Sequence, residues 1–118
     1  MKPLFFLAVC LASGFAMAQP VQTATEKPKA PEGALYAGSA ANPRLQMDVM
    51  PDVLARAVQR GCAHPMDVKP HVMALPSGDH GERVWKETWV VVCRGGAPAP
   101  VAIEFKESKT DAVKWSFP

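Results

Sequence analysis

Three carboxylates in the C-terminal half of the chain have the chemistry to hold a cation. If the segments around them form an antiparallel sheet, Glu87, Glu107 and Asp111 fall in one row across three strands. Carboxylate oxygens are ligands that Ca²⁺ prefers in proteins. The competing interpretation is a solvated rim at the end of the sheet, and like charges placed opposite one another disfavour that register. We adopt the rim and keep a cation site as the alternative.

A tryptophan near this row could recognise a sugar or a peptide through its ring. Trp89 and Trp115 lie among Val, Ile and Phe and are expected in the core. Trp85 lies beside Glu87 toward the open end of the sheet, where we expect partial exposure. Packing along the edge strand is the favoured role of its ring, and recognition is the alternative. The candidate binding surface therefore consists of Trp85, Glu87, Glu107 and Asp111.

Soft metal ligands occur at alternate positions between Cys62 and Met66, where a thiol, the imidazole of His64 and a thioether follow one another. Such a set suits copper, and His71 could add a further ligand. A disulfide at Cys62 would remove the thiolate, and Met66 is expected in the core. We therefore predict no metal site and no cofactor, with a copper site at His64, Met66 and His71 as the alternative.

The first 18 residues predict export from the cytoplasm. Lys2 gives a positive start, residues 4–12 are apolar, and residues 16–18 match an A-x-A cleavage site. The apolar stretch is shorter than the roughly 20 residues that cross a bilayer, so no membrane span is expected. Cleavage after Ala18 would place the mature chain in the periplasm or outside the cell.

Two cysteines, Cys62 and Cys93, remain after removal of the signal and its Cys10. In an oxidising compartment, two cysteines in a small domain most simply form one disulfide. The link would close a loop of about 30 residues, worth roughly 3 to 4 kcal/mol in the chain-entropy model. It matters because the core of a domain of about 75 residues is marginal without such a link.

The elements that must position these residues begin with one helix. Residues 19–44 are rich in Pro, Ala and Thr and are expected to form a disordered tether, followed by a small disulfide-bonded domain over residues 45–118. A helix is expected over residues 48–60, with Asp48 as N-cap and Gly61 as its stop. The apolar residues assigned to its one buried face are Met50, Val53, Leu54, Ala57 and Val58.

After the helix, the apolar spacing changes from about 3.6 to about 2, which is typical of strands. Four strand segments follow, separated by turn residues, around residues 66–72, 84–93, 101–105 and 113–117. Centring the turns places Cys62 opposite Cys93, Trp89 opposite Met66 and Phe105, and Phe105 opposite Val113. The expected fold class is α+β, with one amphipathic helix packed on a four-stranded antiparallel meander and one disulfide.

The stretch from Trp85 to Gly95 resembles the W-x-E-x-W-x-V-x-x-C-G motif of small uncharacterised exported proteins of Gram-negative bacteria. In that family a further apolar strand follows, as residues 101–105 do here, and with it the resemblance covers about a quarter of the mature chain. The chain departs from the motif at Arg94, which stands between Cys93 and Gly95. It implies an envelope location and a structural cysteine. It supplies no activity.

Composition and motifs narrow the classes of function. The net charge is +2, from 13 basic and 11 acidic residues without a Lys/Arg block, so nucleic acid is not an expected partner. The chain has no G-x-S-x-G, H-E-x-x-H or C-x-x-C motif, so an enzyme is not predicted. We expect an exported, monomeric, non-catalytic domain that binds a partner protein or an envelope component. A periplasmic copper or cation-binding protein is the alternative.

Overall fold

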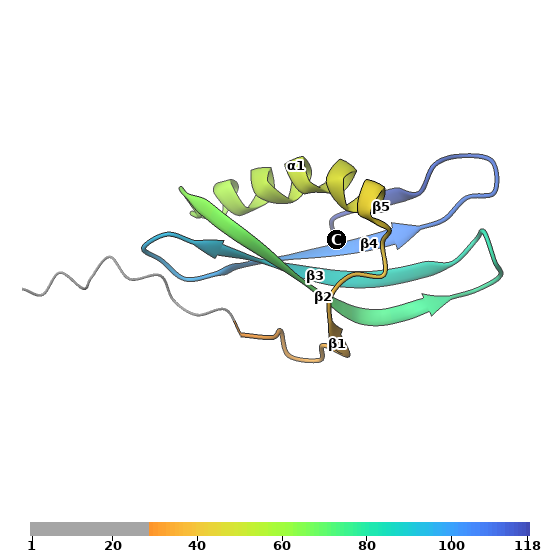
Figure 1. Ribbon diagram of the computed structural model, residues 1–118, viewed down its shortest axis with the longest axis horizontal. Helices are drawn as coiled ribbons and strands as arrows, with labels where there is room; N and C mark the ends of the chain where they lie inside the picture. Colours follow the sequence, from red (N-terminus) through yellow and green to blue (C-terminus); the bar gives the residue numbers. More distant parts are fainter. Residues whose placement is uncertain (1–28) are drawn as a thin grey trace, which may run out of the picture.

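The computed structural model describes residues 29–118, which form one helix lying across one face of a five-stranded antiparallel sheet (Figure 1). The helix is α1 (Pro43–Gln59), and the strands follow one another in the sheet in sequence order: β1 (Tyr36–Ala37), β2 (Pro65–Ser77), β3 (Val84–Cys93), β4 (Ala99–Lys106) and β5 (Lys114–Ser116). The α+β class is confirmed, with five strands instead of four. The expected signal and residues 19–28 of the expected tether lie outside the described residues.

The additional strand comes from the segment expected to be a tether, so that expectation is wrong for its second half. In β1, Tyr36 and Ala37 pair with Val72 and His71 of β2. The pairing is flanked by a 2.8 Å hydrogen bond from the Gly38 N–H to the Pro70 carbonyl. Backbone hydrogen bonds to an open sheet edge order this segment, and composition carries little information about such bonds.

Helix α1 begins five residues earlier than expected. Asn42 is its N-cap, with its side-chain oxygen accepting a 2.8 Å hydrogen bond from the Leu45 N–H, and Pro43 occupies the first turn. Asp48 and Pro51 offer the same chemistry but lie inside the helix, where Asp48 forms an ion pair with Arg44 at 3.5 Å. The stop is as expected, because Gly61 follows the C-cap with a positive φ of 102°.

The core lies between α1 and the inner face of the sheet. The helix buries a row at every fourth position, made of Leu45, Val49, Val53 and Ala57. That spacing keeps one narrow stripe of a helix facing its neighbour. The row packs over the sheet residues Trp85, Trp89, Val91, Val101, Ile103 and Phe105. Trp85 and Phe105 stack with their ring centroids 5.0 Å apart.

The expected disulfide is confirmed, although the strand register that suggested it is wrong. Cys62 and Cys93 are bonded with their Cα atoms 5.5 Å apart, but Cys93 pairs across the sheet with Pro65, so Cys62 lies in the connection after α1. Trp89 pairs with Pro70 on one side and Val101 on the other. Bulges in β2 shift the first hairpin. In the centre of the sheet, the observed pairings differ from the expected ones by an even number of residues. Each side chain there is therefore on the face of the sheet that was expected.

The last two strands show the same displacement. Phe105 pairs with Trp85 in β3 and with Trp115 in β5, where Trp89 and Val113 were expected. The turns are wider than the tight ones assumed from sequence, since the pairing between β4 and β5 ends at Lys106 and Lys114. These residues remain on the inner face, so the core composition was predicted better than the register.

The outer strands β1 and β5 are short, and the stretches of β2 and β4 that they leave unpaired carry features that discourage further strands. On the β4 edge, Pro100 has no N–H, and its carbonyl accepts a hydrogen bond from the Arg60 guanidinium. On the β2 edge, the Val68 N–H donates to the Asp67 carboxylate at 2.8 Å, and Pro70 has no N–H. Such devices discourage strand addition.

Among residues 29–118, no helix is long and apolar enough to cross a membrane.

Candidate functional site

The glutamate of the W-x-E-x-W stretch is a core residue. Glu87 is only 1% exposed, and its carboxylate accepts hydrogen bonds of 2.8 Å from the indole N–H groups of Trp85 and Trp89. A third bond of 2.9 Å comes from the backbone N–H of Ala40. Trp85 is 4% exposed, so the expectation of a partly exposed ring is wrong. Alternation along β3 places all three side chains inward, where the indoles satisfy the buried carboxylate.

The other two members of the expected surface lie elsewhere. Glu107 accepts two side-chain hydrogen bonds from the Arg83 guanidinium, of 2.9 and 2.8 Å, and one of 3.0 Å from the Arg83 backbone N–H. Hydrogen bonding to the Arg83 side chain, and then to its backbone, lowers the pKa of Glu107 to about 2. Asp111 is exposed in the connection between β4 and β5. The expected carboxylate row is therefore not assembled, because Glu87 pairs across the sheet with Ile103 and Glu107 lies beyond the end of β4.

The alternative copper ligands are also separated. Cys62 is in the disulfide, His64 is exposed just before β2, and Met66 is 55% exposed instead of buried in the core. His71 pairs with Thr88 in the middle of β2. Seven residues of extended strand place the two histidines roughly 20 Å apart. Within the described part of the chain, no group of three or more His, Cys, Asp or Glu side chains could hold a metal ion.

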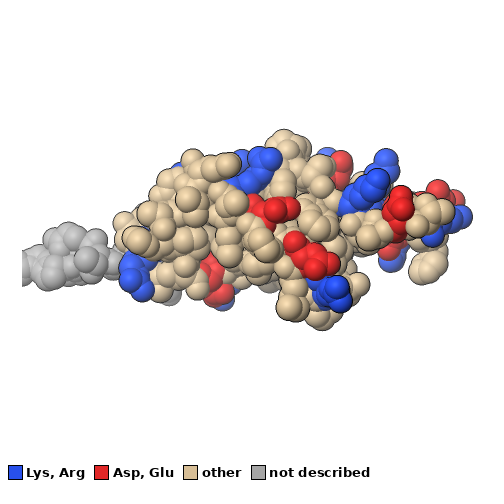
Figure 2. Space-filling model, turned by 90° about the horizontal axis from the view of Figure 1, so that it is seen from above, with Lys and Arg blue, Asp and Glu red and all other residues tan. Residues whose placement is uncertain are grey.

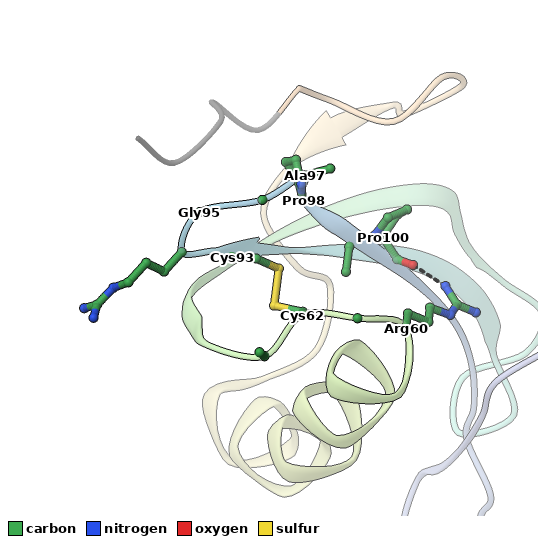
Figure 3. Close-up of a pocket in the computed structure, with 12 residues that line it drawn as sticks. Arg60, Cys62, Cys93, Gly95, Ala97, Pro98 and Pro100 are labelled. Atoms are coloured by element: carbon green, nitrogen blue, oxygen red, sulfur yellow. Dashed lines mark hydrogen bonds between the residues drawn. A yellow bond between two sulfur atoms is a disulfide. The ribbon is translucent and has the colours of Figure 1, made fainter. Parts of the chain in front are cut away.

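A hollow of about 480 Å³ lies beside the disulfide, between the end of α1 and the β3–β4 turn (Figure 3). Its charged lining residues are Arg60 and Arg94, and no carboxylate lines it. Figure 3 shows the Arg60 guanidinium bonded to the Pro100 carbonyl, so this cation already has a partner. The hollow therefore lacks the convergent polar groups that a specific small-molecule site requires.

The most distinctive surface is the side of α1 that faces neither the core nor β5. We call it the open flank. It consists mainly of apolar residues: Pro43, Met47, Met50, Pro51, Leu54 and Val58 of α1 and Pro65, Met66 and Val68 of β2. The polar Gln46 and Asp67 also lie on it. Met47 is 71% exposed and Val58 is 51% exposed. These helix positions adjoin the buried row, so the apolar sector of α1 is wider than the sheet beneath it covers.

Two shallow grooves run along the open flank. One of about 650 Å³ lies on the helix itself, and one of about 260 Å³ lies between the helix and the start of β2. Met50 and Leu54 line both, so the two grooves adjoin one another. Figure 2, which views the molecule from the α1 side, shows wide areas without charged side chains between scattered ones. Contiguous apolar surface of this kind typically marks an interaction site.

The opposite side of α1 is closed by β5 and the residues after it. Asp52 accepts a 2.9 Å hydrogen bond from the Trp115 indole N–H, and the Arg56 guanidinium lies 4.3 Å from the centre of the Phe117 ring. Here charged side chains recur at every fourth position, as Arg44, Asp48, Asp52, Arg56 and Arg60. Polar and aromatic partners thus cover one flank of the helix, and the other is left to solvent.

Sequence reasoning missed the open flank because it assigned Met50, Leu54 and Val58 to the single buried face. The sequence did carry a signal for it. Apolar residues spaced at both three and four positions cover a wider arc of the helix surface than the buried row from Leu45 to Ala57 does. Chemically, thioethers, aliphatic chains and proline rings can bind but cannot transfer protons.

Comparison with known protein families, curated proteins and solved structures finds no match to this chain.

Proposed function

We propose that this chain is an exported, non-catalytic binding domain whose open flank docks a partner protein of the cell envelope. The observation that carries the proposal is the asymmetry of α1. Its Asp52 side is tied to Trp115 by a hydrogen bond, and its Met47 side is apolar and faces solvent. A small domain has little apolar surface to spare, so a continuous exposed stripe is best explained by a partner.

The partner is expected to present an amphipathic helix. The guarded edges at Val68 and Pro100 disfavour a partner that adds a strand. A helix laid in a groove is the other common mode, and it uses apolar anchors at steps of three and four. The adjoining grooves that share Met50 and Leu54 suit such anchors. Methionine side chains adapt to the shape of a partner surface.

The apolar contribution of the open flank is comparable in size to the cost of association. Fully burying a Leu, Val or Met side chain contributes about 1.5 to 3 kcal/mol. Complete burial of Met47, Leu54 and Val58 would therefore offset a large part of the cost of association, which is estimated at about 4 to 15 kcal/mol. The net affinity must come from the further contacts that the partner makes around these side chains.

Export is part of the same proposal. Residues 1–18 carry the pattern of a secretory signal, and the bond between Cys62 and Cys93 is of the kind that persists in the periplasm or outside the cell. The disulfide ties the end of α1 to β3. It thereby fixes the helix, and the flank on it, over the sheet.

Matched lysine substitutions on α1 test the docking surface. Met47→Lys and Leu54→Lys place a charge on the open flank, and Ala55→Lys places the same charge on an exposed position outside it. We expect both flank variants to lose the partner, first in capture from an envelope extract and then with the purified partner, and Ala55→Lys to retain it. Equal binding by all three folded variants would contradict the proposal.

A further inference from the structure

We infer, on the basis of the proposed function, that Met47, Met50 and Met66 form an oxidation site through which peroxide weakens docking at the open flank. Residues 29–118 contain four methionines, and three of them lie on this one surface. Met50 lines the groove that contains Met47 and also the groove that contains Met66. The fourth, Met73, lies in β2 outside both grooves.

Access favours the flank methionines. Met47 is 71% exposed and Met66 is 55% exposed. Met73 is half-buried, and its terminal methyl group lies close to Gly33. Oxidation of a thioether follows its exposure. Met47 and Met66 are therefore expected to react first, ahead of the partly buried Met50 and Met73.

No thiol competes for the oxidant within the described residues. Cys62 and Cys93 are bonded to each other and are each 3% exposed. In the reaction, the thioether sulfur loses two electrons to hydrogen peroxide and gains one of its oxygen atoms. The O–O bond breaks, an S=O bond forms, and the second peroxide oxygen leaves as water. The product is methionine sulfoxide.

The consequence falls on docking and spares the fold. A sulfoxide oxygen is a strong hydrogen-bond acceptor, and the apolar face of a partner helix would leave it unsatisfied. Each sulfoxide buried in this way is expected to weaken partner binding about tenfold. The buried row of α1 contains no methionine, being Leu45, Val49, Val53 and Ala57. Met50 packs partly against the core, whereas Met47 and Met66 lie outside it. Oxidation of Met47 and Met66 is therefore expected to leave the packing between helix and sheet unchanged.

The experiment treats the purified disulfide-bonded protein with hydrogen peroxide and follows each methionine by peptide mass spectrometry. Retention on octyl-agarose serves as the probe of the open flank, because it needs no identified partner. We expect sulfoxide at Met47 and Met66 several-fold sooner than at Met73, earlier elution from the column, and an unchanged melting temperature. The triple variant Met47→Leu/Met50→Leu/Met66→Leu should keep its retention after peroxide, whereas Met73→Leu should behave like the parent protein.

Three results would overturn the inference: Met73 reacting as fast as Met47, retention unaffected by conversion of the flank methionines, or equal loss of retention in the triple variant. Melting that falls together with retention would also overturn it, by assigning the change to unfolding. These measurements use the protein alone. A negative result would therefore contradict the oxidation site without contradicting the proposed function. The proposed function is contradicted by a different result, which is partner binding by unoxidised Leu54→Lys.

Discussion

The indole N–H of Trp89 donates a 2.8 Å hydrogen bond to Oε1 of Glu87, two residues earlier on the same strand. Trp85, two residues earlier still, bonds the other carboxylate oxygen. The W-x-E-x-W stretch of β3 is thus a buried hydrogen-bonded set within one strand. Because Ala40 also donates to this carboxylate, the set ties the chain entering α1 to the centre of the sheet.

Replacing Glu87 tests this arrangement. Glu87→Gln keeps the shape but turns one acceptor oxygen into an NH₂ donor, which then faces an indole or backbone N–H. An unsatisfied buried donor costs about 1 to 3 kcal/mol, so we expect a loss of that size in the free energy of unfolding, measured by urea denaturation. The control is Glu104→Gln, on the outer face of the sheet. A loss no larger than that of the control would contradict the structural role of Glu87.

The contact between Asp52 and Trp115 is expected to hold β5 to the helix. Asp52→Ala removes the acceptor of the 2.9 Å bond, at a site that is partly open to solvent. We expect a loss of about 1 kcal/mol in the free energy of unfolding and faster hydrogen exchange of the β5 amides. Asp48→Ala, one helical turn away, removes only a surface ion pair. The same exchange rates in both variants would argue against a β5 contact at Asp52.

Acid should weaken the pair between Arg83 and Glu107. Because the folded-state pKa of Glu107 is lowered to about 2 from its ordinary value of 4.5, the pair stabilises the protein fully above pH 4.5. Its contribution is lost as the pH falls from about 4.5 through about 2. Glu107→Gln should therefore show a shallower loss of stability over this range than the parent protein. Parallel curves of melting temperature against pH for the two proteins would contradict this assignment.

Reduction of the disulfide should cost much of the stability of the domain. The bond joins residues 31 apart in sequence, and closing such a loop contributes roughly 3 to 4 kcal/mol. We expect dithiothreitol to lower the urea midpoint of the parent protein. Dithiothreitol should not change the urea midpoint of the Cys62→Ser/Cys93→Ser variant, and that midpoint should equal the one of the reduced parent protein. An unchanged midpoint in the parent protein would mean that packing alone holds α1 on the sheet.

Sequence reasoning reached the elements of this fold but not their alignment. Alternation assigned Trp89, Val101, Ile103 and Phe105 to one face correctly, because a side chain's face depends on the parity of its position. Register depends on turn length and bulges, and these have no comparable periodic signal. The disulfide was correct for a compositional reason, since Cys62 and Cys93 are the only two cysteines outside the expected signal. The register offered in its support was not correct.

The candidate site was the least predictable part. Glu87 and Trp85 have residue types that suggest binding, and nothing in their spacing reveals that indoles close around the carboxylate. Met66 was assigned to the core because it alternates with Val68 and Val72, but the bulge after Pro65 takes it out of that pattern. The open flank could not be predicted without the position of β5, because β5 determines which side of α1 is covered.

Photo-cross-linking from α1 tests the central claim most directly. A photoreactive amino acid at position 47, on the open flank, is compared in whole cells with one at position 55, an exposed helix position outside the flank. The account predicts one adduct from position 47, reproduced with the purified partner and absent from position 55. Equal adducts from both positions, or an adduct from position 55 alone, would show that the open flank is not the binding surface.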